Sequence, residues 1–250
     1  MNNIETFIRV KKGSIPIIIS VPHGGTIELE KIPKRNNGVL GIDKYTIGLA
    51  HELVSIMKQK SREIFSSLKS PSYVMSKIHR SHLDLNREES EAFDPNSKLA
   101  KKLYDHYHQK LEKLIYYNIS NFKKSILIDL HGFEQHKRPT GFREVDIVLG
   151  TNNLTSLFPH DVKLRERDKN FRGDLIKKFI KLNIPIAPGH PRRREYILTG
   201  GYITQKYGAS NIVGSQSIQI ELSDKIRVFD KELKKQVLDT MAEIFLNAVI

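Results

Sequence analysis

Residues 125–132 read SILIDLHG, and this stretch decides the fold class. Apolar side chains at successive positions predict a strand that is buried on both faces, as in the middle of a parallel sheet. Residues 15–21, IPIIISV, show the same pattern. Both runs end in a histidine followed by glycine, at His23-Gly24 and His131-Gly132. The two runs therefore predict neighbouring buried strands with polar groups where they end.

Weaker strand patterns lie between amphipathic helical patterns along the rest of the chain. We predict further strands over 73–78, 145–149 and 217–222, and helices over 43–60, 94–117, 171–182 and 230–249. Asp43 and Asp94 stand where side-chain caps of the first two helices are expected. This alternation predicts an α/β protein with a mostly parallel or mixed central sheet and helices on both faces.

Length and composition narrow the class of protein. The 250 residues contain no internal repeat and no linker-like segment, so we predict a single α/β domain over 1–250. The chain has no cysteine, which excludes disulfides, thiolate metal sites and a cysteine nucleophile. A bound metal must therefore be held by nitrogen and oxygen.

The chain is strongly basic, with 41 Lys and Arg against 28 Asp and Glu, a net charge of +13. Such a balance allows a nucleic-acid partner or an anionic substrate, but the lysines are spread along the chain, which favours a diffuse solvated surface. The densest run, Arg192-Arg193-Arg194, is interpreted as a solvated loop, with recruitment of an acidic substrate, a phosphate or nucleic acid as the alternatives. The apolar run at 15–21 is too short to span a bilayer, so we expect a cytoplasmic protein with no membrane partner.

Candidate metal ligands cluster at the predicted carboxyl ends of the strands, where α/β sheets place their sites. His23 and Glu28 follow the first strand, and His131 ends the strand over 125–130. Imidazole nitrogen and carboxylate oxygen both suit zinc. Asp129 is close enough to act as an outer partner of a ligand. Either histidine alone could be a capping or core residue, but two of them beside glycine at strand ends favour a shared site.

Three further groups could act on a substrate. Glu221 interrupts an apolar strand, where a carboxylate is costly unless it is used or pairs with a cation such as Arg227. Arg80 and Arg87 could grip a carboxylate or an oxyanion, or belong to a solvated basic stretch. Gly201 and Tyr202 could bring backbone amides to an anion, or simply begin a helix.

Five segments in one order resemble the N-formylglutamate amidohydrolase family, a relative of the zinc carboxypeptidases. They cover most of the chain between residues 15 and 230 and are 21–25 VPHGG, 83–87 LDLNR, 128–131 IDLH, 199–202 TGGY with 207–208 YG, and 219–221 QIE.

The resemblance implies a phosphorylase/hydrolase-like fold and a zinc-dependent amidohydrolase that acts on an N-acyl amino acid or a γ-glutamyl-like amide with a free carboxylate. Zinc would activate water and polarise the scissile carbonyl. The implied roles are metal ligation by His23, Glu28 and His131, general base Glu221, carbonyl-polarising Arg80, and substrate binding by Asn86, Arg87, Gly201 and Tyr202.

The chain also departs from the family pattern. Gly24 and Gly132 stand where many members have serine, and residues 222–227, LSDKIR, lack the expected Arg-x-x-Tyr ending. Two alternative functions therefore stay open: a hydrolase of aminoacyl- or peptidyl-tRNA, and a non-catalytic basic binding protein with a degenerate metal site. Strong salt dependence of binding would favour the first, and absence of metal from the purified protein would favour the second.

Overall fold

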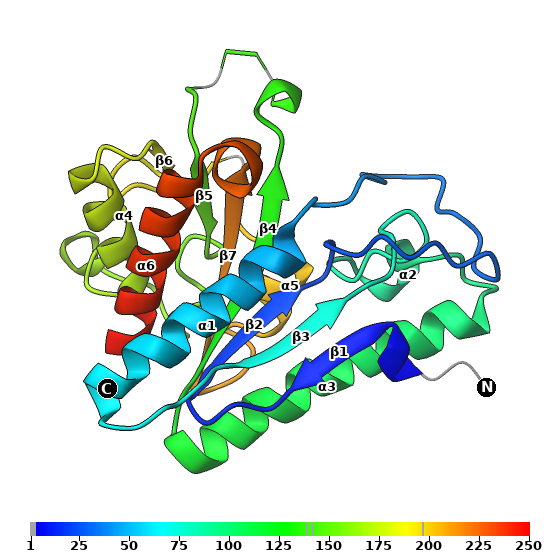
Figure 1. Cartoon of the computed structure of the whole chain (residues 1–250), viewed down its shortest axis with the longest axis horizontal. Helices are drawn as coiled ribbons and strands as arrows, with labels where there is room; N and C mark the ends of the chain where they lie inside the picture. Colours follow the sequence, from blue (N-terminus) through cyan, green and yellow to red (C-terminus); the bar gives the residue numbers. More distant parts are fainter. Residues whose placement is uncertain (1–3, 139, 142, 197) are drawn as a thin grey trace.

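A seven-stranded sheet organises the protein in the computed structural model, which describes residues 4–138, 140–141, 143–196 and 198–250 (Figure 1). The strands follow the order β1-β3-β2-β4-β7-β5-β6 across the sheet. They are β1 Ile8–Lys11, β2 Ile17–Val21, β3 Ser72–Ser76, β4 Ser125–Phe133, β5 Ile147–Gly150, β6 Ile186–Ala187 and β7 Ser215–Ser223.

The centre of the sheet is parallel and its flanks are mixed. β3, β2, β4 and β7 run parallel to one another, whereas β1 is antiparallel to β3 and β5 is antiparallel to β7. β5 and β6 are again parallel. The two continuous apolar runs form the adjacent central strands β2 and β4, which confirms the predicted α/β class with a mixed sheet.

Helices cover both faces of this sheet. α1, α4 and α6 pack over one face, and α3 and α5 lie on the other, each with its own cluster of buried apolar side chains. No helix in the described ranges is long and apolar enough to cross a membrane. The helices are α1 Thr46–Phe65, α2 Glu89–Ala92, α3 Lys98–Phe122, α4 Phe171–Lys181, α5 Tyr202–Lys206 and α6 Lys231–Asn247.

The two predicted aspartate caps are wrong. α1 begins after Tyr45, which adopts a left-handed conformation and makes no side-chain cap bond. α3 begins after Ser97, whose hydroxyl accepts a hydrogen bond from the Ala100 N–H. The Asp43 carboxylate is therefore free to point elsewhere.

The alternation of side chains along β4 and β7 places polar groups on one face at the carboxyl ends of these strands. Ile128 and Leu130 pack into the core beneath α1 and α6, so Asp129 and His131 point to the opposite face. In the parallel register Asp129 lies beside Gln219, and His131 lies beside Glu221. The sheet thereby brings two pairs of polar side chains together at the carboxyl ends of β4 and β7.

Candidate functional site

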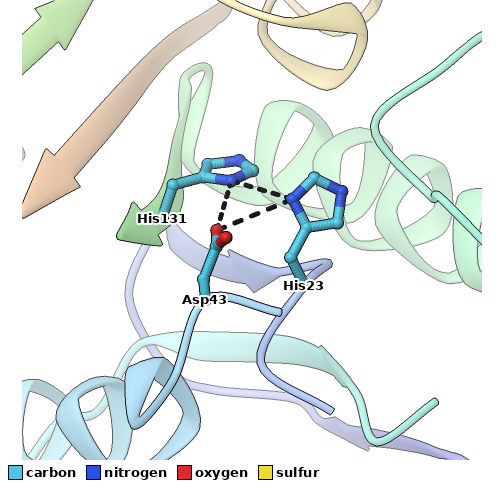
Figure 2. A group of neighbouring side chains, drawn as sticks. All are labelled: His23, Asp43 and His131. Atoms are coloured by element: carbon cyan, nitrogen blue, oxygen red, sulfur yellow. Dashed lines mark hydrogen bonds and ion pairs between the residues drawn. The ribbon is translucent and has the colours of Figure 1, made fainter. Parts of the chain in front are cut away.

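Two histidines and one carboxylate converge at the carboxyl ends of the central strands (Figure 2). The Nδ1 atoms of His23 and His131 lie 3.2 Å apart. Asp43 Oδ2 lies 3.1 Å from Nδ1 of His131 and 3.6 Å from Nδ1 of His23. All three side chains are buried. One potential ligand atom from each of these three side chains lies within 4.8 Å of the other two, which is close enough for all three to bind one metal ion.

Backbone contacts hold the three ligands together although they come from three segments. His23 follows β2, His131 lies in β4, and Asp43 precedes α1. The Asp43 N–H donates to the His23 carbonyl at 3.0 Å, which closes the long loop between them. The Gly132 N–H donates to Asp43 Oδ2 at 3.2 Å. The carboxylate is thus oriented by the chain segments that carry the two histidines.

The outer nitrogen of each histidine is held by a buried carboxylate. His23 Nε2 lies 2.6 Å from Asp84 Oδ1, and His131 Nε2 lies 2.8 Å from Asp129 Oδ2. A neutral imidazole that donates through Nε2 presents its Nδ1 lone pair on the opposite side. Two such lone pairs and a carboxylate oxygen repel one another when they face each other in a buried site. A cation bound between them would turn this repulsion into attraction. The donor set and its outer partners therefore fit a zinc ion.

The electrostatics of the cluster agree with this fit. Burial raises the pKa of Asp43, but its contacts with His131 and His23 outweigh burial and lower this pKa below its ordinary value. Burial lowers the pKa of His131, whereas the charge and hydrogen bond of Asp129 raise it well above its ordinary value. The lowered pKa of Asp43 and the raised pKa of His131 both mean that negatively charged carboxylates favour positive charge in this cluster.

Glu28, the predicted third ligand, is not in this cluster. Its side chain is 54% exposed and pairs with Lys34 at 3.0 Å. After β2 the chain continues alongside the end of β3 through bridges of Gly25 to His79 and Ile27 to Ile78. This path carries Glu28 away from His23, and Asp43 supplies the carboxylate in its place.

Glu221 lies beside the cluster on β7, next to His131 in the register. Its carboxylate accepts a hydrogen bond from Gln219 Nε2 at 2.8 Å. Burial and the Asp43 charge raise the pKa of Glu221, although His131 opposes them. Arg227, the alternative partner, donates instead to the carbonyls of Leu222 and Phe133. The structure therefore places a buried carboxylate with a raised pKa next to the candidate metal ligands.

Asp84 links the histidine His23 to the arginine segment that precedes α2. Its Oδ2 accepts from Arg80 Nε at 2.9 Å and lies 3.9 Å from Arg87 Nε. Arg80 also reaches within 3.9 Å of Asp43 Oδ1. Arg80 is mostly buried, while Arg87 is 43% exposed and keeps part of its guanidinium in solvent. One fully buried aspartate thus contacts a candidate metal ligand and two candidate substrate-binding cations.

The three candidate metal ligands line a cavity of about 1170 Å³ together with Arg80, Arg87 and Glu221. Asn86, Gly201 and Tyr202 line it together with the residues above. The Gly201 N–H donates to Gln219 Oε1, and the Ile203 N–H donates to Asn86 Oδ1 at 2.8 Å. Since both amides already have side-chain acceptors, the Gly-Gly segment serves as a tight turn into α5.

Packing explains the two glycines that depart from the family pattern. A Cβ at Gly24 would lie 2.5 Å from Thr46 Oγ1, and one at Gly132 would lie 2.4 Å from Arg227 Nε. These contacts are too close for any side chain. Arg227 crosses over Gly132, so a serine side chain at position 132 has no room here.

The structure brings together His23, His131, Glu221, Arg80, Asn86, Arg87, Gly201 and Tyr202 around one cavity. Sequence reasoning missed Asp43, Asp84 and Gln219. A signal for Asp43 existed, because the residue before a helix that packs on a parallel sheet lies at the edge where the strands end. Asp84 lies in the segment 83–87 and Gln219 in the segment 219–221, so both stand next to residues that the resemblance implies for the site.

Comparisons with solved structures place this fold in a known class. The structure of N-formylglutamate amidohydrolase from Ralstonia eutropha is similar, with a TM-score of 0.61 and 14% sequence identity over 97% of both chains. A gene product of Agrobacterium tumefaciens gives a TM-score of 0.57 and 15% identity over 97% of this chain and 93% of that one. No protein-family model and no curated protein matches the sequence. The chain therefore has the fold of an N-formylglutamate amidohydrolase, as the resemblance of its motifs implies.

Proposed function

We propose that the protein is a zinc-dependent amidohydrolase that cleaves the amide bond of an N-acyl amino acid, such as N-formylglutamate or a γ-glutamyl-like compound. The observation that carries the proposal is the convergence of two Nδ1 atoms and one carboxylate oxygen beside the buried Glu221. The fold shared with N-formylglutamate amidohydrolase supports it.

His23, Asp43 and His131 would hold the zinc, which when bound would activate water and polarise the scissile carbonyl. Glu221 would accept a proton from the attacking water and deliver it to the leaving amine. The raised pKa of Glu221 makes it a stronger base toward the attacking water, and a carboxylic acid is still acidic enough to protonate the leaving amine.

Arg80 would stabilise negative charge on the carbonyl oxygen during attack. Its Nε bond to Asp84 fixes the guanidinium in position beside the cluster. Asn86 and Arg87 would bind the carboxylate of the amino acid. Arg87 Nη1 lies 3.6 Å from the exposed Glu91, and the partial exposure of the guanidinium leaves its other donors available to a ligand.

The proposed function is tested by assaying the zinc-loaded protein on N-acyl amino acids with a free carboxylate and on their carboxamides, with Arg87→Ala as the variant. An unmade charge-assisted hydrogen bond costs about 1.5–3 kcal/mol, so kcat/KM for the free acid should fall at least ~10-fold in the variant. The carboxamide should be affected by less than about twofold, because a neutral end group does not form that bond.

Lys137→Ala is a suitable control, since Lys137 also lines the cavity and, like Arg87, pairs with a neighbouring glutamate. Equal losses on the acid and the carboxamide would show that Arg87 does not recognise the carboxylate. Absence of hydrolysis of any N-acyl amino acid by the zinc-loaded protein would contradict the proposed function itself.

A further inference from the structure

Three arginines at the opening of the cavity have no carboxylate partner in the part of the chain that the structure describes. Arg138 belongs to the segment between β4 and β5, and Arg193 and Arg194 belong to the segment between β6 and α5. All three line the cavity, and Arg193 and Arg194 are exposed, unlike the buried metal ligands. The exposed part of the lining, which also includes Glu88 and Glu91, thus carries positive charge that no carboxylate of the described residues pairs with.

A buried ion pair fixes the segment that carries two of these arginines. Arg172 of α4 donates from Nε to Glu195 at 2.8 Å, and both side chains are about 1% exposed. Arg172 also donates to the carbonyls of Pro191 and Arg193, each at 3.0 Å. The N–H groups of Thr151 and Asn153 donate to Glu195. The backbone that carries Arg193 and Arg194 is thus anchored on both sides, so their side chains extend from a fixed stretch of the cavity lining.

The neighbouring Arg192 behaves differently. Its Nε donates to Asp168 at 2.9 Å, so its charge is already compensated by a carboxylate outside the cavity. Arg138 is held from the other segment by a hydrogen bond from Nη1 to the Arg143 carbonyl at 3.1 Å, and its guanidinium lies 5.5 Å from the centre of the Phe133 ring. Only part of the arginine run is therefore available to a ligand.

The order of the strands separates two positive regions. Asn86 and Arg87 follow β3 on one side of the ligand-bearing strands β2 and β4. Arg193 and Arg194 follow β6 at the far edge on the other side, where Glu195 ties them to the end of β5. If the amino-acid carboxylate is bound at Asn86 and Arg87, the acyl part of the substrate extends toward the arginines at the opening.

We propose that Arg138, Arg193 and Arg194 form a second anion subsite, which binds an acidic group at the end of the acyl chain of the substrate. This inference rests on the proposed function and adds the substrate class: an N-acyl amino acid whose acyl part is longer than formyl and ends in a carboxylate. A cavity of about 1170 Å³ has room for such a substrate, since pockets of about 300–1,000 Å³ already enclose drug-sized ligands. Arginine suits the subsite because its planar fork matches a carboxylate.

The test compares an N-succinyl amino acid with its succinamoyl counterpart, which differs only in the charge at the end of the acyl chain. In the wild-type protein kcat/KM should be higher for the acid. The double substitution Arg193→Ala with Arg194→Ala should lower kcat/KM for the acid by roughly 10-fold at low salt and leave the amide within about twofold. Arg192→Ala should leave both substrates unchanged. Equal effects of the double substitution on acid and amide would overturn the subsite.

Two further measurements distinguish failure of the proposed reaction from failure of the anion subsite. Calorimetric titration of both compounds into the zinc-loaded Glu221→Gln variant tests the subsite without turnover: tighter binding of the acid that disappears in the double variant supports it, and equal affinities contradict it. If neither compound is hydrolysed while the binding difference persists, the proposed reaction fails and the subsite stands. If the double variant instead weakens binding of a single-stranded RNA oligonucleotide over a salt series, with the acid-to-amide ratio unchanged, the arginines contact RNA and the proposal is wrong.

Discussion

Glu221→Gln should reduce turnover of an N-acyl amino acid by ~10²–10⁴ while the protein still binds zinc. The substitution keeps the shape of the side chain and the hydrogen bond with Gln219 can be re-formed, but the proton acceptor is lost. Because the metal cluster consists of His23, Asp43 and His131, removal of this carboxylate should not release the metal. The measurement is kcat together with zinc content, on the same preparation.

Glu134→Gln is the matched control, since Glu134 lines the same cavity and pairs with Lys137. Its turnover should remain close to that of the wild-type protein. Unchanged turnover in Glu221→Gln would show that Glu221 has only a structural role. Loss of zinc along with turnover would make Glu221 a ligand, which the arrangement of the site does not predict.

Arg172→Met should lower the free energy of unfolding by about 3–5 kcal/mol, because it leaves the buried Glu195 carboxylate without its charge partner. Thr151 and Asn153 still donate to Glu195, but they do not neutralise it. Urea denaturation followed by circular dichroism measures the change.

Replacing Glu195 by Gln in the Arg172→Met background should recover part of this loss, since the uncompensated charge is then removed. Arg192→Ala, which breaks an exposed pair with Asp168, should leave the free energy of unfolding nearly unchanged. A free energy of unfolding for Arg172→Met equal to that of the wild-type protein would show that Glu195 is compensated in another way.

The fold was predictable where burial leaves a continuous apolar pattern. β2 and β4 are buried along their lengths, and their runs are visible in the sequence. The edge strand β1 has four residues, three of them exposed, and β6 has only two residues. Neither is long enough to show a period, so both depend on pairing with neighbours that are distant in sequence.

The site was predictable where its residues end a strand, and not where they come from a loop. His23 and His131 follow apolar runs, so their positions in the fold could be inferred. Asp43 contacts His131 across 88 residues of sequence, and an aspartate before an amphipathic helix is equally typical of a cap. The closeness of Glu28 to His23 in sequence favours it as a ligand, but bridges to Ile78 and His79, which follow β3, direct its segment elsewhere.

The central claim is that His23, Asp43 and His131 hold one metal ion, and the zinc content of two carboxylate variants tests it most directly. Wild-type protein, Asp43→Ala and Glu28→Ala are loaded with zinc, dialysed together and measured by mass spectrometry of the metal, with circular dichroism to confirm folding. We expect about one zinc per chain in the wild-type protein and in Glu28→Ala, and far less in folded Asp43→Ala, because only Asp43 belongs to the ligand set. Retention of zinc in Asp43→Ala, or its loss in Glu28→Ala, would contradict the account.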